Sequence, residues 1–332
     1  MESDLEISVK GLPEKLAHEV GNTIAAIIKD FENIDVGLDF RRMHRIEVTT
    51  DFTGELTELS KKTASGNQIS HTNEDYAVAV AKIMMIPDGD EIEICPVLSA
   101  QYFAALVPED SEGYNADNFY YIRHSLHHEL CHVHDDNKKI DTLHDVMLKH
   151  HYKGKDMFIG PLSEICWAEY IANLLSAKTA TENNLKDIVT NFKDAIKRTK
   201  GNIDNAILSY RYHADLNKLL EIFKRHGEFL VKMASYTLGY MDGLGVTLKE
   251  LSLETAQTIS GSYFESTWEE LHKALKKMKS DYPEAWKDLS IYNQLSNVLE
   301  KYYDKMGLIL STTEDGGTYV DIPFRAETTP NH

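Results

Sequence analysis

Cysteine is scarce in this chain, and none of its cysteines forms a recognisable pair. The three residues, Cys95, Cys131 and Cys166, are odd in number and widely spaced among 332 residues, with no CxxC motif. This excludes a disulfide framework, a cysteine zinc knuckle and a dithiol redox motif, because each of these needs paired or closely spaced thiols. We expect three free thiols, with Cys131 and Cys166 as small core residues.

Basic residues and long apolar runs are also in short supply. The 35 basic residues are outnumbered by 53 acidic residues, which gives a formal net charge of -18. Such a charge repels nucleic acid and anionic lipid surfaces, and no basic block offsets it. No apolar run approaches membrane-spanning length, and the start lacks the features of a secretory signal. We therefore expect a cytoplasmic protein that binds neither nucleic acid nor membrane.

The chain does contain short periodic segments that predict an α+β fold. Apolar residues recur at helical spacing over residues 13–33, and "RIEVTTDF" alternates as a strand does. The segments "YAVAVAKIMMI" and "IEICPVL" flank the turn "PDGDE" and predict a β-hairpin. Pro96 cannot donate to a ladder, so it favours an edge position for the second strand, over residues 92–98.

Two further apolar patterns predict helices, and the rest of the chain divides around them. After residue 114 the run "NADN" offers N-cap candidates for a helical apolar stripe, and "LSEICWAEYIANLLSA" follows Gly160 and Pro161 and is apolar enough for the interior. Residues 183–306 are mostly helical in pattern, and "GLILSTTEDGGTYVDIPF" predicts a terminal β-hairpin. We expect a domain over residues 1–180, with an N-terminal helix, a small mixed sheet and these two helices. A mostly helical region follows over residues 181–332.

The segment "HELCH" is the strongest chemical signal. It places His128 and His132 four residues apart on one helical face, so both imidazoles can reach one Zn²⁺ at about 2.1 Å from each nitrogen. Glu129, next to the first ligand, would point at a metal-bound water and take its proton as a general base. The spacing therefore predicts a site for one zinc ion per chain.

A catalytic zinc site of this type needs a third protein ligand, and Glu169 fits that need. It lies 37 positions after His132 on the next apolar helix, where a buried carboxylate without a partner would be costly. Asn173, one turn further on, shares its face and could orient a histidine ligand through its amide oxygen.

Other histidines fit the ligand role less well. His134 is only two residues past His132 and points away from the shared face, while His150 and His151 remain possible ligands by composition. We expect three histidines to be solvated or to lie behind the ligands: His124, His127 and His134.

"HELCH" and "EYIAN" resemble the motifs of the zincin metallopeptidases, specifically the glutamate-ligand branch. In that branch HExxH is followed on a later helix by Glu and, four residues on, by Asn or Asp. The metzincin extension would need Gly and His where Asp135 and Lys138 stand. "EYIANLLSA" is similar to the E-x-x-A-N-x-x-x-A signature of the ImmA/IrrE-type peptidases, which cleave repressor-like regulators. The resemblance covers about residues 46–177 and implies a zincin-like fold with His128, His132 and Glu169 as zinc ligands. The chain departs from that family by lacking a recognisable helix-turn-helix or sensor domain.

Peptide hydrolysis also needs a hydrogen-bond donor for the carbonyl oxygen, which becomes negatively charged in the tetrahedral intermediate. The run "YRYH" offers Tyr212 or His213 for this role, and the alternative is that these residues make only ordinary packing and surface contacts. The predicted function is a zinc metallopeptidase acting on a peptide or protein that adds to the edge strand. Two alternatives stay open. One is a non-catalytic zinc-stabilised protein-interaction module closed by four protein ligands, and the other is a metal-free helical scaffold with a chance HExxH.

Overall fold

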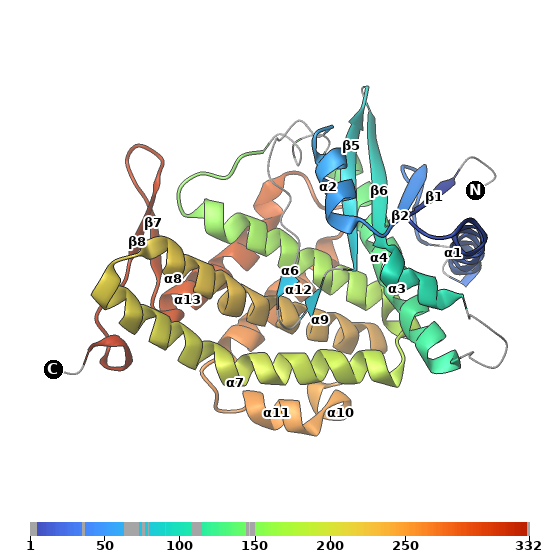
Figure 1. Cartoon of the computed structure of the whole chain (residues 1–332). Helices are drawn as coiled ribbons and strands as arrows, with labels where there is room; N and C mark the ends of the chain where they lie inside the picture. The colour runs from blue at the N-terminus through green and yellow to red at the C-terminus, as the bar shows by residue number, and fades with distance from the viewer. Residues whose placement is uncertain are drawn as a thin grey trace. The chain divides into compact units, whose positions relative to one another are not determined.

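The computed structural model describes residues 5–34, 37–62, 73–74, 77–78, 80–89, 91–107, 115–143, 146 and 150–330 (Figure 1). The fold is α+β, mostly helical with a small mixed sheet, as the sequence predicts. Two compact units divide the chain: residues 1–149 with 175–184, and residues 150–174 with 185–332. None of the described helices combines the length and the apolar character needed to cross a bilayer.

The sheet of the first unit has the strand order β1-β2-β6-β5. β1 and β6 both pair with β2 in parallel, and β5 pairs with β6 in antiparallel, which confirms the predicted hairpin. The strands are β1 (Glu6–Lys10), β2 (Arg45–Thr49), β5 (Ala81–Asp88) and β6 (Glu91–Ser99), and β3 (Asn73–Glu74) pairs separately with β4 (Ala77–Val78).

The edge strand beside β6 is β5, so the prediction that residues 92–98 form the edge is wrong. β6 pairs with β5 along its length and also with β2 from Val97 to Ser99. Ile94 N donates to Arg42 O on the β2 side, and Pro96, two residues further on, faces the same side. Because the ladder with β2 begins only at Val97, the missing N–H of Pro96 falls at its margin, where an interior strand tolerates it.

Alternate residues of β6 face two hydrophobic cores. Ile94 and Leu98 pack in a cluster with α1 and α4, whereas Cys95 and Val97 pack with α2, which lies beside β5 and β6 in Figure 1. The α1–α4 core fixes the helix that carries "HELCH". The helical elements of this unit are α1 (Glu14–Ile34), α2 (Phe52–Ser60), α3 (Ala100–Phe103), η1 (Ala104–Leu106), α4 (Ala116–Leu143) and η2 (Ala177–Thr179).

The second unit is built mainly of helices, and α6 supplies much of its core. Trp167, Tyr170 and Ile171 of α6 are at most 1% exposed, which confirms the predicted interior helix. Figure 1 shows α7 running back beside α8 and α9, and Thr199 of α7 donates to His226 O in the turn that joins α8 to α9. The helices are α6 (Asp156–Ser176), α7 (Glu182–His213), α8 (Leu216–Phe223), α9 (Phe229–Leu244), α10 (Leu248–Leu251), α11 (Leu253–Ile259), α12 (Glu265–Asp281) and α13 (Asn293–Met306).

The predicted terminal hairpin is present as β7 (Ile309–Thr312) and β8 (Thr318–Asp321). One π-helical turn, η3 (Lys224–Glu228), joins α8 to α9, and short 3-10 turns lie at η4 (Leu289–Tyr292) and η5 (Ala326–Thr328). The two units differ from the domains expected at residues 1–180 and 181–332, because residues 150–174 group with the C-terminal helices. The close approach of α6 to α9 at Gly239 and the hydrogen bond from Tyr170 to Asp242 are consistent with this grouping.

Candidate metal centre

α4 brings His128 and His132 together on one face. Their Nε2 atoms lie 3.1 Å apart, and the two rings are perpendicular with centroids 4.6 Å apart. Two nitrogens bound to one tetrahedral zinc at 2.0–2.1 Å would be separated by about 3.3 Å. The histidine pair of "HELCH" therefore has the spacing of two ligands of one ion. Glu129, between them in the chain, is half-buried on the same helix.

His124 and His127 lie before this pair on α4 and are buried. Both Nδ1 atoms contact the hydroxyl of Thr179, at 2.9 Å from His124 and 2.8 Å from His127. The His127 ring stacks on Phe31, with centroids 4.3 Å apart. Burial, with smaller effects of His128 and His127, lowers the pKa of His124 to about 3. Burial excludes the solvated alternative for these two residues, and Thr179 fixes their rings.

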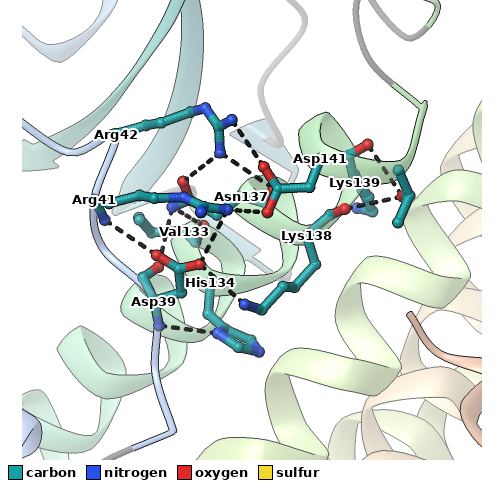
Figure 2. A network of polar contacts seen from close by, with 10 residues as sticks. Asp39, Arg41, Arg42, Val133, His134, Asn137, Lys138, Lys139 and Asp141 are labelled. Carbon is teal, nitrogen blue, oxygen red and sulfur yellow. Dashed lines mark hydrogen bonds and ion pairs between the residues drawn. The ribbon is translucent and has the colours of Figure 1, made fainter. Parts of the chain in front are cut away.

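His134 lies beyond the pair and is also buried, so it is not solvated either. Its Nδ1 accepts a hydrogen bond of 3.0 Å from Asp39 N, as Figure 2 shows. Lys138 Nζ, one turn further on, pairs with the carboxylate of Asp39 at 2.9 Å. His134 therefore anchors the loop before β2 to α4.

Asn137 completes this attachment. Its Nδ2 donates to Asp39 O and Val133 O, both at 3.0 Å, and its Oδ1 accepts from Arg42 Nη1 at 3.1 Å (Figure 2). Arg42 also pairs with Asp141 at 2.8 Å. This network holds α4 in place directly after the histidine pair.

Glu169 lies on α6 in the second unit, and α9 fixes that stretch of helix. Gly239 of α9 lies against α6: a Cβ atom built on it would be 2.4 Å from Tyr170 O and 2.8 Å from the Cβ of Asn173. Tyr170 donates to the Asp242 carboxylate at 2.6 Å. The only residue type that permits this approach at position 239 is glycine.

Glu169 is 9% exposed. Its carboxylate pairs with Lys232 of α9, with 3.1 Å between Oε1 and Nζ. Sequence reasoning did not single out Lys232. The signal was present, because Lys232 is the one charged residue in the apolar stretch "FLVKMASYTLGYM". A buried carboxylate on α6 required such a partner.

Asn173 is fully buried one turn after Glu169. Its Nδ2 donates to Glu169 O at 2.6 Å, and its Oδ1 has no hydrogen-bond partner among the described residues. The amide oxygen is thus a buried acceptor, and its predicted role in orienting a histidine stays a prediction.

Tyr212 and His213 lie at the C-terminal end of α7. Tyr212 is 76% exposed, and His213 Nδ1 accepts a hydrogen bond of 2.9 Å from Asp215 N. This bond uses one ring nitrogen of His213 within the turn between α7 and α8. A catalytic role for either residue stays a prediction.

His128, His132 and Glu169 form a group that could hold a metal ion, with two imidazole nitrogens and one carboxylate oxygen as ligand atoms. Among the described residues, the alternative ligands His134, His150 and His151 do not belong to this group. Nitrogen and carboxylate ligands in this number fit Zn²⁺. Comparison with protein-family models, with curated proteins and with solved structures finds no match to this chain.

Proposed function

We propose that this protein is a zinc-dependent metallopeptidase of the glutamate-ligand zincin type, with one Zn²⁺ held by His128, His132 and Glu169. The observation that carries the proposal is the 3.1 Å separation of the two histidine Nε2 atoms. Three protein ligands leave one coordination position open, as in catalytic zinc sites, whereas structural sites normally have four. This difference favours an enzyme over a zinc-stabilised interaction module.

The chain that follows α6 supports Glu169 as the third ligand. Thr179, three residues after the end of α6, is bonded to His124 and His127, close to His128 in the same helix. α6 is unbroken from Glu169 to Ser176. The helix that carries Glu169 therefore leads directly into a segment fixed on α4.

Besides the three zinc ligands, the reaction needs one general base, and Glu129 fills that role. A bound zinc ion would polarise the scissile carbonyl and lower the pKa of a bound water towards neutrality. Glu129 takes a proton from the attacking water and returns it to the leaving amine. An extended peptide would pair with β5, the outer strand of the described sheet, in the role first expected of residues 92–98.

Zinc analysis tests the metal site directly. We expect one zinc per chain in the purified protein, none in His132→Ala, and one in His134→Ala, because His134 Nδ1 is engaged by Asp39 N. The last variant is a matched control two residues along the same helix. Equal zinc in the His132→Ala and wild-type proteins, or no zinc in wild type when it is offered, would contradict the proposal.

A general base variant tests the activity. Glu129→Gln should retain its zinc and lose hydrolysis of a broad protein substrate such as casein by about 10²- to 10⁴-fold. Full activity in this variant would rule out the mechanism. A zinc-loaded protein that cleaves no member of a diverse peptide library would favour the interaction module instead.

A further inference from the structure

α9 carries two charged side chains, and both contact consecutive residues of α6. Asp242 accepts from Tyr170 and also contacts His272 Nε2 at 3.0 Å. Lys232 pairs with Glu169 through its Nζ, at 3.1 Å from Oε1. Asp242 is thus hydrogen-bonded to Tyr170 and His272, whereas Lys232 directs its charge at a proposed metal ligand.

The position of Lys232 brings it close to the proposed chemistry. Zinc–carboxylate bonds measure 2.0–2.2 Å, so a metal on Glu169 Oε1 would lie within about 5 Å of Lys232 Nζ. The scissile carbonyl has to lie beside that metal. An oxygen on the side of the metal that faces Lys232 would come within hydrogen-bonding reach of the ammonium group without movement of α9.

The surroundings of Lys232 suit an anion. Its side chain is 26% exposed, so a ligand can reach it, while Val231 and Met233 on either side are buried. Tyr236, one turn on, holds the ammonium 5.6 Å from its ring centroid. A metal that shares the charge of Glu169 would leave Lys232 under-compensated beside the site, where low exposure strengthens its interaction with an incoming anion.

We propose that Lys232 stabilises the negative charge that develops on the scissile carbonyl oxygen, the role first expected of Tyr212 or His213. This inference rests on the proposed metallopeptidase function. Preorganised cations aimed at a developing charge are a large contribution to catalysis. Lys232 is then a catalytic residue, since it touches the reacting oxygen, and its ion pair with Glu169 is the resting arrangement of its side chain.

Binding of inorganic phosphate to the metal-loaded Glu129→Gln protein tests this role without any need for a known substrate. The protein is loaded with Co²⁺, and its visible spectrum follows phosphate binding. Lys232→Met should weaken phosphate binding by about 10- to 100-fold because one charge-assisted hydrogen bond is lost, and Lys232→Arg should restore part of it. Lys276→Met is the control, because Lys276 is 61% exposed and contacts Asp242 instead.

Several outcomes separate this inference from the proposed function. A parent protein that takes up no metal would overturn the function itself. A parent that binds metal, with equal phosphate affinity in Lys232→Met or with no phosphate binding at all, would overturn only the role of Lys232. With a cleaved peptide in hand, Lys232→Met should lower kcat and leave KM and zinc content unchanged. If circular dichroism shows that Lys232→Met does not fold, the phosphate affinity of Lys232→Arg decides. We expect it to be lower than that of the control Lys276→Met, and equal affinities of these two variants would contradict the role.

Discussion

Gly239 lies so close to Tyr170 that a methyl group on it would be 2.4 Å from the Tyr170 backbone oxygen. Gly239→Ala must therefore separate α9 from α6, because a backbone atom cannot swing aside as a side chain can. We expect a loss of about 1–3 kcal/mol in the free energy of unfolding, measured by urea denaturation. Zinc uptake should also weaken, since Glu169 precedes Tyr170 on the displaced helix.

Gly201→Ala is the control for this change. Gly201 lies within α7, and a Cβ atom there would meet nothing within 4 Å. Alanine should stabilise this helix by up to about 1 kcal/mol. Equal effects of the two substitutions would show that α6 and α9 are not in close contact at Gly239.

Thr179 gives a second test of how α4 is fixed. In Thr179→Val the Nδ1 atoms of His124 and His127 lose their shared partner while the volume is conserved. A buried polar atom without a partner costs about 1–3 kcal/mol, so the free energy of unfolding should fall by that amount. Thr179→Ser keeps the hydroxyl and should retain most of the stability. Chemical denaturation distinguishes them, and equal loss in both variants would contradict the role of the hydroxyl.

Asn137 joins three other residues of the network in Figure 2: Asp39, Val133 and Arg42. Asn137→Ala removes its bonds to Asp39 O, Val133 O and Arg42, and we expect the free energy of unfolding to fall by about 2–3 kcal/mol. Asn118→Ala, at an exposed position of the same helix, should change it by less than about 0.5 kcal/mol. Amide hydrogen exchange of residues 38–44 should accelerate only in the first variant. Unchanged exchange there would mean that the loop is held by other contacts.

The lowered pKa of His124 predicts a loss of stability in acid. The unfolded chain takes up a proton near pH 6.5, whereas the folded protein does so only near pH 3. The unfolded state therefore binds more protons between these values, and stability falls as the pH is lowered through this window, by about 1.4 kcal/mol per pH unit for one histidine. In His124→Gln this contribution is absent. Parallel pH dependences of the free energy of unfolding in both proteins, between pH 7 and pH 5, would refute it.

Local periodicity was enough to predict several elements. α1, the β5–β6 hairpin, α4 and the terminal hairpin follow from repeats of 3.6 or 2 residues that are read within each segment. The 3.1 Å histidine pair follows in the same way, because helix geometry alone relates residues four apart.

Other features depend on which segments meet in the folded chain. Pro96 suggested that β6 is an edge strand. β6 can be an interior strand because its hydrogen-bond ladder with β2 begins only at Val97, after the proline. Proline is common in the first turn of a helix, so the sequence placed the start of this helix at Pro161. α6 instead begins at Asp156 and contains Pro161 within it. The contact between Lys232 and Glu169 needs two helices about sixty residues apart in sequence, and no spacing rule connects them.

The shared hydroxyl of Thr179 also limits where protons can reside. Thr179 Oγ1 has one proton to give, and it lies near His124 Nδ1, His127 Nδ1 and, at 3.0 Å, Ser176 O. If Thr179 donates this proton to Ser176 O, both imidazoles must donate to Oγ1 and therefore carry a hydrogen on Nδ1. If Thr179 donates it to one imidazole, the other imidazole must carry a hydrogen on Nδ1. At least one histidine of this pair is therefore protonated at Nδ1, and nitrogen-15 NMR would detect it as a slowly exchanging ring N–H.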